Sequence, residues 1–446
     1  MKKPRVSIHW FRRDLRLGDN HGLYRALTEH GDVLPLFIFD TNILDKLGTP
    51  KDRRVDFIHR TLVALDASLR EGGSALHVAH GDPLDVWKKL LEHYEVTAVT
   101  ANHDHEPYAE ERDQAVRTFL EANGIAFRTF KDISIFERGE VLKDDGKPYT
   151  VFTPYARKWR ALFDARMAEP FPSEKHLDRL HKLRGTPLPS LSTIGFERTD
   201  LEVPPLKVSD ELLRRYHDTR NLPAINGTSK MSTHLRFGTV SVRELVRRSL
   251  ALSPTYLNEL IWREFFMQIL WHFPHPERAF KPAYDNIPWQ ADEKAFSAWC
   301  EGRTGYPLVD AGMRELNATG LMHNRVRMVV ASFLTKHLLL DWRWGESYFA
   351  THLLDFELSS NNGGWQWASG SGCDAAPYFR VFNPTLQMER FDPQLNYVKN
   401  WVPEYGSANY AKPFVVHEVA RKRAIETYKS ALGEKGGSER QTKLFA

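Results

Sequence analysis

The chain has 446 residues, which is too long for one simple core, and its formal net charge of +4 does not by itself identify nucleic acid as a partner. It has only two cysteines, Cys300 and Cys373, which argues against a disulfide framework and a cysteine metal cluster. The sequence shows neither a run of membrane-spanning length nor a signal-peptide core at its start (MKKPRVSIHWFRRDLR). We expect a cytoplasmic protein with no bound metal and no membrane partner, and a monomer because no heptad pattern is present.

Short apolar runs alternate with helical patterns over residues 1–132. Strands are predicted at 5–10, 33–40, 74–80, 96–102 and 125–130, and helices at 20–30, 52–71, 83–94 and 107–123. This alternation predicts an α/β domain with a doubly wound parallel sheet. The sequence contains neither a G-x-G-x-x-G fingerprint after the first strand nor a phosphate-binding P-loop, so ordinary dinucleotide binding in this domain is not supported.

Charged residues follow two of the predicted strands. Arg12, Arg13, Asp14 and Arg16 come after the first strand, and residues 102–106 come after the fourth. Ligands of such sheets bind at the carboxyl ends of the strands, which favours a binding edge here. Solvated ion pairs explain the same residues equally well, and both interpretations stay open.

The pattern weakens from 133 to 206, where Pro and Gly recur, and we interpret this stretch as an inter-domain connector with one helix near 154–168. Residues 207–446 form the predicted all-helical domain. Its helices are expected near 209–220, 229–236, 241–251, 255–272, 291–300, 306–319, 322–340, 345–354 and 415–430. The charged tail after Gly433 is expected to fray.

Three stretches of the helical domain combine polar and aromatic side chains. Glu259, Trp262 and Arg263 share one helical face by their spacing, and Asn324, Arg327 and Met328 share another. The segment 355–384 (DFELSSNNGGWQWASGSGCDAAPYFRVFNP) joins paired amides, paired glycines and two tryptophans. Together these features favour a pocket for a large, flat, polar ligand. A Trp-rich core and a buried ion-pair network between helices are the alternatives. GTSKMS (227–232) could bind phosphate at a helix start, although Ser and Thr are common helix caps.

These motifs resemble the photolyase/cryptochrome family over almost the whole chain. The matching stretches are HWFRRDLRLGDN, GTSKMS, LNELIWREFF, GYPLVDAGMREL, TGLMHNRVRM and NNGGWQWASGSGCDAAPYFRVFNP. The resemblance implies an α/β antenna domain, a connector, and a helical domain that binds FAD. Within the family, the pattern is similar to enzymes that split cyclobutane pyrimidine dimers in UV-damaged DNA, using an electron from excited, reduced FAD.

The resemblance also implies roles for individual residues. The FAD-binding set would be Tyr216, Thr228, Ser229, Lys230, Met231, Ser232, Arg263, Arg327, Asp355, Phe356, Glu357 and Asn361, with Asn361 beside the flavin N5. The catalytic set would be Glu259, Asn324, Asn361, Trp262, Trp367 and Met328, all but Asn361 at the lesion. DNA contacts would be made by Arg220, Glu259, Trp262, Arg263, Asn324, Arg325 and Gln387, and electrons would pass along Trp289, Trp342 and Trp365.

Two comparisons within the family narrow the expected activity. Enzymes for the (6-4) photoproduct carry His where Asn324 and Met328 stand, so (6-4) repair is disfavoured. Trp367 and the short C-terminal end favour repair over a pure blue-light receptor, which stays the alternative. Glu106 matches a folate-binding acid, but His275-Pro276 stands where the matching Cys-Lys pair is expected. The antenna chromophore is therefore open between folate, deazaflavin, another flavin, and none.

Overall fold

The computed structural model describes residues 3–183 and 187–433. These residues group into two compact units. The first contains residues up to Asp218, Thr228–Pro274 and Leu354–Ser359, and the second contains Thr219–Gly227, His275–Leu353 and the chain from Ser360 onward. The predicted domain boundaries at residues 132 and 206 stay a prediction. The predicted frayed tail after Gly433 lies outside the described residues.

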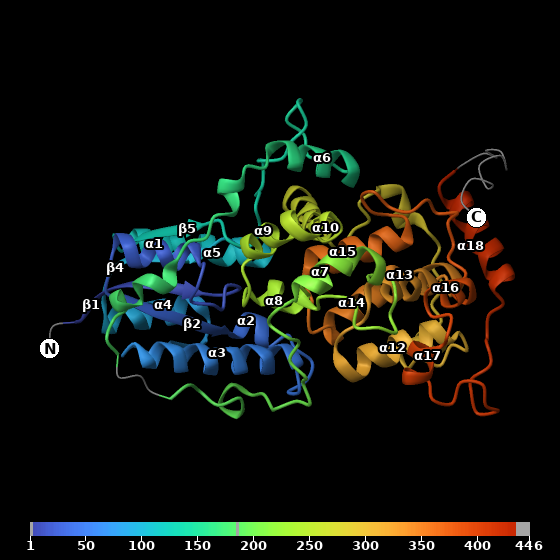
Figure 1. The fold of residues 1–446 in the computed structure, drawn as a ribbon, viewed down its shortest axis with the longest axis horizontal. Coiled ribbons are helices and arrows are strands. Elements are labelled where there is room, and N and C mark those ends of the chain that lie inside the picture. The colour runs from blue at the N-terminus through green and yellow to red at the C-terminus, as the bar shows by residue number, and fades with distance from the viewer. Residues whose placement is uncertain (1–2, 184–186, 434–446) are drawn as a thin grey trace. The chain divides into compact units, whose positions relative to one another are not determined.

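The first unit is built on a five-stranded parallel sheet, which lies in the blue-to-teal part of the chain in Figure 1. Its strand order is β3-β2-β1-β4-β5, which confirms the predicted doubly wound sheet. Its strands are β1 Arg5–Phe11, β2 Val33–Asp40, β3 His77–Gly81, β4 Glu95–Asn102 and β5 Ala126–Phe130. β2 is buried along its whole length, as expected for a strand with both faces covered. Helices α4 (Pro83–His93) and α5 (Pro107–Ala122) share one apolar core with the strands, built around Trp10 and Trp87.

The other helices of this unit lie between its strands in sequence or follow β5. They are α1 His21–Glu29, α2 Thr41–Leu44, α3 Arg53–Glu71, α6 Phe152–Leu162, α7 Asp210–Thr219, α8 Met231–Phe237, α9 Val242–Leu252 and α10 Pro254–His272. The predicted connector holds α6 and short 3-10 turns at Ala165–Ala168, Ser173–Arg179 and Ser192–Ile194. Helix α6 ends at Leu162, earlier than predicted, and its next residue, Phe163, is extended.

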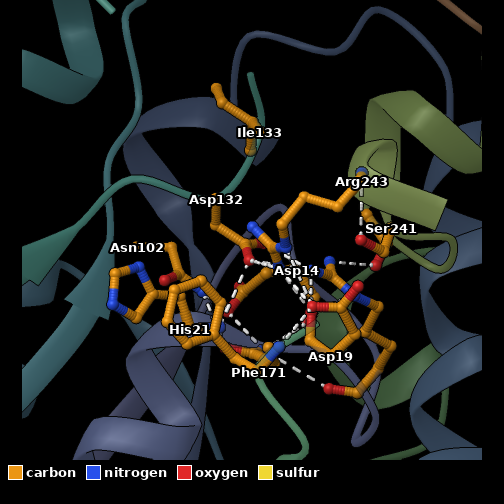
Figure 2. Close-up of polar contacts among 12 residues, drawn as sticks. Asp14, Asp19, His21, Asn102, Asp132, Ile133, Phe171, Ser241 and Arg243 are labelled. Carbon is orange, nitrogen blue, oxygen red and sulfur yellow. Dashed lines mark hydrogen bonds and ion pairs between the residues drawn. The ribbon is translucent and has the colours of Figure 1, made fainter. Parts of the chain in front are cut away.

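A buried polar network joins the strand ends to α9 (Figure 2). Asp132, which follows β5, accepts hydrogen bonds from Arg16 Nη2 at 2.7 Å and from Arg243 Nη2 at 2.7 Å. Asn102, at the end of β4, donates to Asp14 Oδ2 at 2.7 Å. The strand-end charges are therefore paired, as one interpretation predicted, but Asp14 is only 1% exposed and is not solvated. These buried bonds hold in place the segments that follow β1, β4 and β5 at this edge of the sheet.

The second unit is helical among its described residues. Its helices are α11 Glu293–Cys300, α12 Pro307–Thr319, α13 Asn324–Ser332, α14 Trp342–His352, α15 Leu358–Ser369 (which begins in the first unit), α16 Pro384–Phe391, α17 Asn396–Trp401 and α18 His417–Ala431, with a 3-10 turn at Pro282–Asn286 and a π-helical turn at Phe333–His337. The single helix predicted over 322–340 is thus divided. Helices α15, α16 and α17 were not predicted, and in α15 the paired Gly363 and Gly364 lower helix propensity.

No helix among the described residues is long and apolar enough to cross a membrane.

Candidate functional site

Trp262 lies on α10 with one face of its indole covered. The ring of Phe152, the first residue of α6, is stacked on it with a centroid distance of 3.7 Å and an interplanar angle of 7°. Phe152 is 8% exposed, whereas Trp262 is partly exposed, as is Glu259 one turn earlier. The sequence did not indicate Phe152, because it lies in the predicted connector and no periodicity relates it to α10.

Arg263 and Glu357, both predicted to line the flavin, are joined directly. Arg263 Nη2 lies 3.2 Å from Glu357 Oε1, and Arg263 Nη1 donates to the Ile133 carbonyl at 2.8 Å. Arg13 Nη2 donates to the same Glu357 oxygen at 2.5 Å. Arg263 is therefore ion-paired in the fold, and its contact with the flavin stays a prediction.

The same cluster includes Glu106, the predicted antenna contact. Glu106 Oε1 accepts from Arg236 Nη1 at 2.7 Å and from Arg13 Nη1 at 3.3 Å. Arg13 also donates to Asp104 Oδ1 at 2.8 Å. Arg236 was not among the predicted site residues, and Arg13 was named only as one of the charges that follow the first strand. The pairing of both with these carboxylates came only with the fold.

The charges of this cluster decide the ionisation of its acid. Burial alone would raise the pKa of Glu357, but the charges of Arg263 and Arg13 lower it by more, so that the pKa lies at about 2. Asp355 is 8% exposed, and Phe356 between the two acids is half-buried. An ionised, buried carboxylate between two guanidinium groups holds Arg263 in place and leaves it charged.

Tyr216 and Ser229 are connected through Tyr256. The Tyr216 ring contacts the Tyr256 ring edge-on at 5.0 Å, and the Tyr256 hydroxyl lies 2.9 Å from Ser229 Oγ. Lys230 adopts a left-handed conformation (φ 54°) at the start of α8. Thr228 and Ser229 are half-buried before the helix, Met231 is buried, and Ser232 is exposed. This arrangement gathers hydroxyl and backbone donors, which suits phosphate oxygens.

In the second unit, Asn361 lies on α15 and points its amide toward α14. Asn361 Nδ2 donates to Glu346 Oε1 at 2.8 Å and to the Glu346 carbonyl at 3.1 Å. Asn361 is 8% exposed. Burial raises the pKa of Glu346, so this carboxyl favours its neutral form more than an exposed one does. The two contacts fix the amide, whose oxygen remains the acceptor that Asn361 offers to other groups.

The three predicted electron-carrying indoles have different surroundings. Trp365 is 2% exposed and contacts the rings of Phe349 at 5.0 Å and Trp299 at 6.0 Å. Trp342, at the start of α14, is buried beneath the Arg343 guanidinium, which lies 4.8 Å from its ring centroid. Trp289 meets the ring of Tyr428 at 5.8 Å. Their order in an electron path stays a prediction.

The predicted lesion and DNA residues of this unit lie on four segments. Asn324 is exposed at the start of α13, and Arg325 Nη1 lies 3.9 Å from Met328 Sδ one turn later. Arg325 Nη2 also donates to Asn221 Oδ1 at 2.7 Å, and Arg220 precedes that residue.

The remaining predicted residues have fewer described contacts. Arg327 Nε donates to the Met322 carbonyl at 2.8 Å. Trp367 is half-buried on α15, 6.4 Å from the Phe382 ring, and Gln387 lies on α16. The roles of these residues stay predictions.

Known proteins are similar to this chain over most of its length. Residues 7–175 match the family model described as DNA photolyase, and residues 256–408 match the model for the FAD binding domain of DNA photolyase. A Halobacterium salinarum protein named deoxyribodipyrimidine photo-lyase is 36% identical, over 96% of this chain and 100% of that protein.

Two solved structures share the fold. An archaeal photolyase from Sulfolobus tokodaii, described with two FAD molecules, is 33% identical with a TM-score of 0.79, covering 95% of this chain and 100% of that chain. The cryptochrome of Synechocystis sp. PCC6803 is 25% identical with a TM-score of 0.82, covering 96% of this chain and 100% of that chain.

Proposed function

Because the chain belongs to the photolyase/cryptochrome family, we propose that it is a light-driven lyase that splits cyclobutane pyrimidine dimers in UV-damaged DNA. That the chain is a photolyase-type enzyme with an FAD-binding domain follows from its relatives. The choice of lesion is the proposal, and it rests on the residues. The single observation that carries it is Trp262, a partly exposed indole backed by a phenyl ring, which is a surface suited to stacking a base.

The donors and acceptors of the site suit FAD. Hydroxyl groups and a helix start at Thr228–Ser232 fit phosphate oxygens, and the charge-paired Arg263 fits a polar ring edge. The fixed amide of Asn361 can hydrogen-bond a ring nitrogen. We propose that these residues, with Tyr216, Arg327, Asp355, Phe356 and Glu357, hold the cofactor. When bound and reduced, FAD supplies the excited electron donor of the reaction.

The proposed work of the chain is to bind the lesion outside the duplex. A dimer inside the double helix cannot reach a buried cofactor, so it must be flipped out, and damaged steps are already weakly stacked. Trp262 and Trp367 would stack on the flipped bases while Glu259 and Asn324 hydrogen-bond their edges. Arg220, Arg325 and Gln387 would contact the neighbouring backbone, which predicts salt-dependent binding.

The absence of histidine at two positions supports the dimer over the (6-4) photoproduct. Asn324 and Met328 stand where (6-4) enzymes carry His for proton transfer. The test is an oligonucleotide with one thymine cyclobutane dimer, lit with blue light after the protein has been photoreduced. Dark samples and a (6-4) oligonucleotide are the controls. Loss of the dimer alone, in light alone, is the expected result. If neither lesion is repaired by reduced, FAD-loaded protein, the proposal is wrong.

A blue-light receptor is the second candidate, supported by the similarity to a cryptochrome and by the buried ring contacts of Trp365. Photoreduction without repair of any lesion would favour it. We further propose a cytoplasmic monomer.

The antenna chromophore is a separate question. The Glu106 carboxylate accepts hydrogen bonds from Arg13 and Arg236, so a folate bound there would have to share this carboxylate with the two arginines. Mass spectrometry of chromophores released from the purified protein identifies the second group.

A further inference from the structure

Helix α6 presents one face to α10 through residues spaced by helical turns. Phe152, Tyr155 and Trp159 are all buried, at 8%, 1% and 1% exposure. Phe152 stacks on Trp262 at 3.7 Å, and Phe265 meets both rings edge-on, at 5.9 Å from Phe152 and 5.7 Å from Trp262. The plane of the Trp262 indole is thus set by a second ring from a different helix.

A buried carboxylate holds α6 in this position. Glu264 Oε1 accepts from Trp159 Nε1 at 2.6 Å, and its two oxygens accept the backbone N–H groups of Ile135 at 2.8 Å and Phe136 at 3.1 Å. Farther along α6, Arg160 Nη2 donates to Asn258 Oδ1 at 2.7 Å. Since Glu264 follows Trp262 by two residues on α10, the helix that carries the indole also fixes the helix that supports it.

We propose that Phe152 is a positioning residue for lesion capture, which holds the indole of Trp262 in the plane on which a flipped base stacks. The inference rests on the proposed function, because Trp262 must first be the stacking residue. A side chain that is ordered before binding loses less conformational freedom when the ligand arrives. The ordering of one side chain that is avoided in this way corresponds to about a 3- to 10-fold change in affinity.

The test is Phe152→Leu in FAD-loaded protein, measured as dark binding to a dimer-containing oligonucleotide and to the same oligonucleotide undamaged. Leucine keeps most of the volume and removes the flat ring. Affinity for the damaged DNA should fall about 3- to 10-fold while affinity for undamaged DNA stays unchanged. Phe152→Tyr should restore the preference because it keeps a ring. Phe152→Met is a second ringless variant if the leucine protein folds poorly, with folding checked by circular dichroism and FAD content.

A double-mutant cycle separates positioning from general stability. On a Trp262→Ala background, Phe152→Leu should cause no further loss of damaged-DNA affinity. Phe163→Leu is the matched control, because Phe163 follows the same helix and stacks on Trp159 at 5.0 Å instead of on Trp262. It should leave both affinities unchanged.

Three results would overturn the inference. They are wild-type affinity in Phe152→Leu, an equal loss on damaged and undamaged DNA, and a full additional loss on the Trp262→Ala background. Failure of the proposed function looks different. In that case the wild-type protein shows no preference for damaged DNA, and Trp262→Ala leaves binding unchanged.

Discussion

Two tryptophans of this protein, Trp365 and Trp262, differ in how far their indoles are buried. Trp365, in the second unit, is 2% exposed, with Phe349 and Trp299 around it and Gly345 against its ring. Trp262, in the first unit, is partly exposed with one face on Phe152. Burial among rings suits a side chain that passes electrons within the protein, whereas a supported but accessible face suits one that binds a ligand. The difference shows that environment, not residue type, separates the two predicted roles.

The largest expected effect comes from Trp365→Phe, which replaces the buried indole. Phenylalanine keeps the aromatic packing but oxidises far less readily than indole, so photoreduction of bound FAD should be lost. Absorption spectra under blue light measure it. Repair should persist once the flavin is reduced chemically, which separates this role from lesion binding. Photoreduction at the wild-type rate would show that electrons reach the flavin by another route.

A second change tests the support behind Trp262. Burial raises the pKa of Glu264 to about 7, although Ile135, Trp159 and Phe136 donate hydrogen bonds that lower it. The folded protein therefore binds more protons than the unfolded chain between about pH 4.5 and 7. The contribution of Glu264 to stability is fully present below pH 4.5 and is lost as the pH rises to 7. The loss amounts to at most about 3 kcal/mol.

The measurement is the free energy of unfolding at pH 5 and pH 8 for the wild type and Glu264→Gln. Glutamine does not titrate, so its stability should fall less steeply over this interval. Its amide N–H₂ must also face an N–H donor, which costs about 1–3 kcal/mol at pH 5. Equal slopes for the two proteins would show that Glu264 does not titrate in this range.

A third change removes the accessible indole itself. Trp262→Ala should weaken binding of a dimer-containing oligonucleotide by roughly 1–3 kcal/mol, because a stacking surface is lost. Dark binding measurements with and without the lesion are compared. Photoreduction should be unchanged, in contrast to Trp365→Phe. Wild-type affinity for damaged DNA would refute the stacking role.

The smallest expected effect comes from tightening the packing around Trp365. A Cβ at Gly345 would overlap the Trp365 ring and lie 2.6 Å from Leu334 Cδ2. Overpacking costs about 1–3 kcal/mol, and roughly 1 kcal/mol of helix propensity offsets it, so Gly345→Ala should destabilise the protein by about 1 kcal/mol in urea unfolding. Gly364→Ala, on α15 with no atom within 4 Å of the added Cβ, is the control and should be neutral or stabilising.

Local patterns identified most of the elements correctly, because apolar runs and helical spacing depend on neighbouring residues. Four of the five strands were predicted within one residue of their observed bounds, and β3 begins at His77 instead of residue 74. Helix α10, predicted as 255–272, is observed as Pro254–His272. Helix α15 was missed because its paired glycines oppose local propensity, whereas the fold holds it against α14 through Asn361 and Trp365.

The motifs predicted which residue types carry the chemistry, since indole, amide and guanidinium groups at helical spacing are visible in the chain itself. The partners of those groups came only with the fold. Phe152 lies just outside the helix predicted at 154–168, in the predicted connector, and Arg13 pairs with Glu357, 344 residues later in the chain. Contacts between residues distant in sequence leave no local pattern. Packing, charge pairing and burial, which set the orientation of Trp262 and the ionisation of Glu357, are therefore properties of the folded molecule.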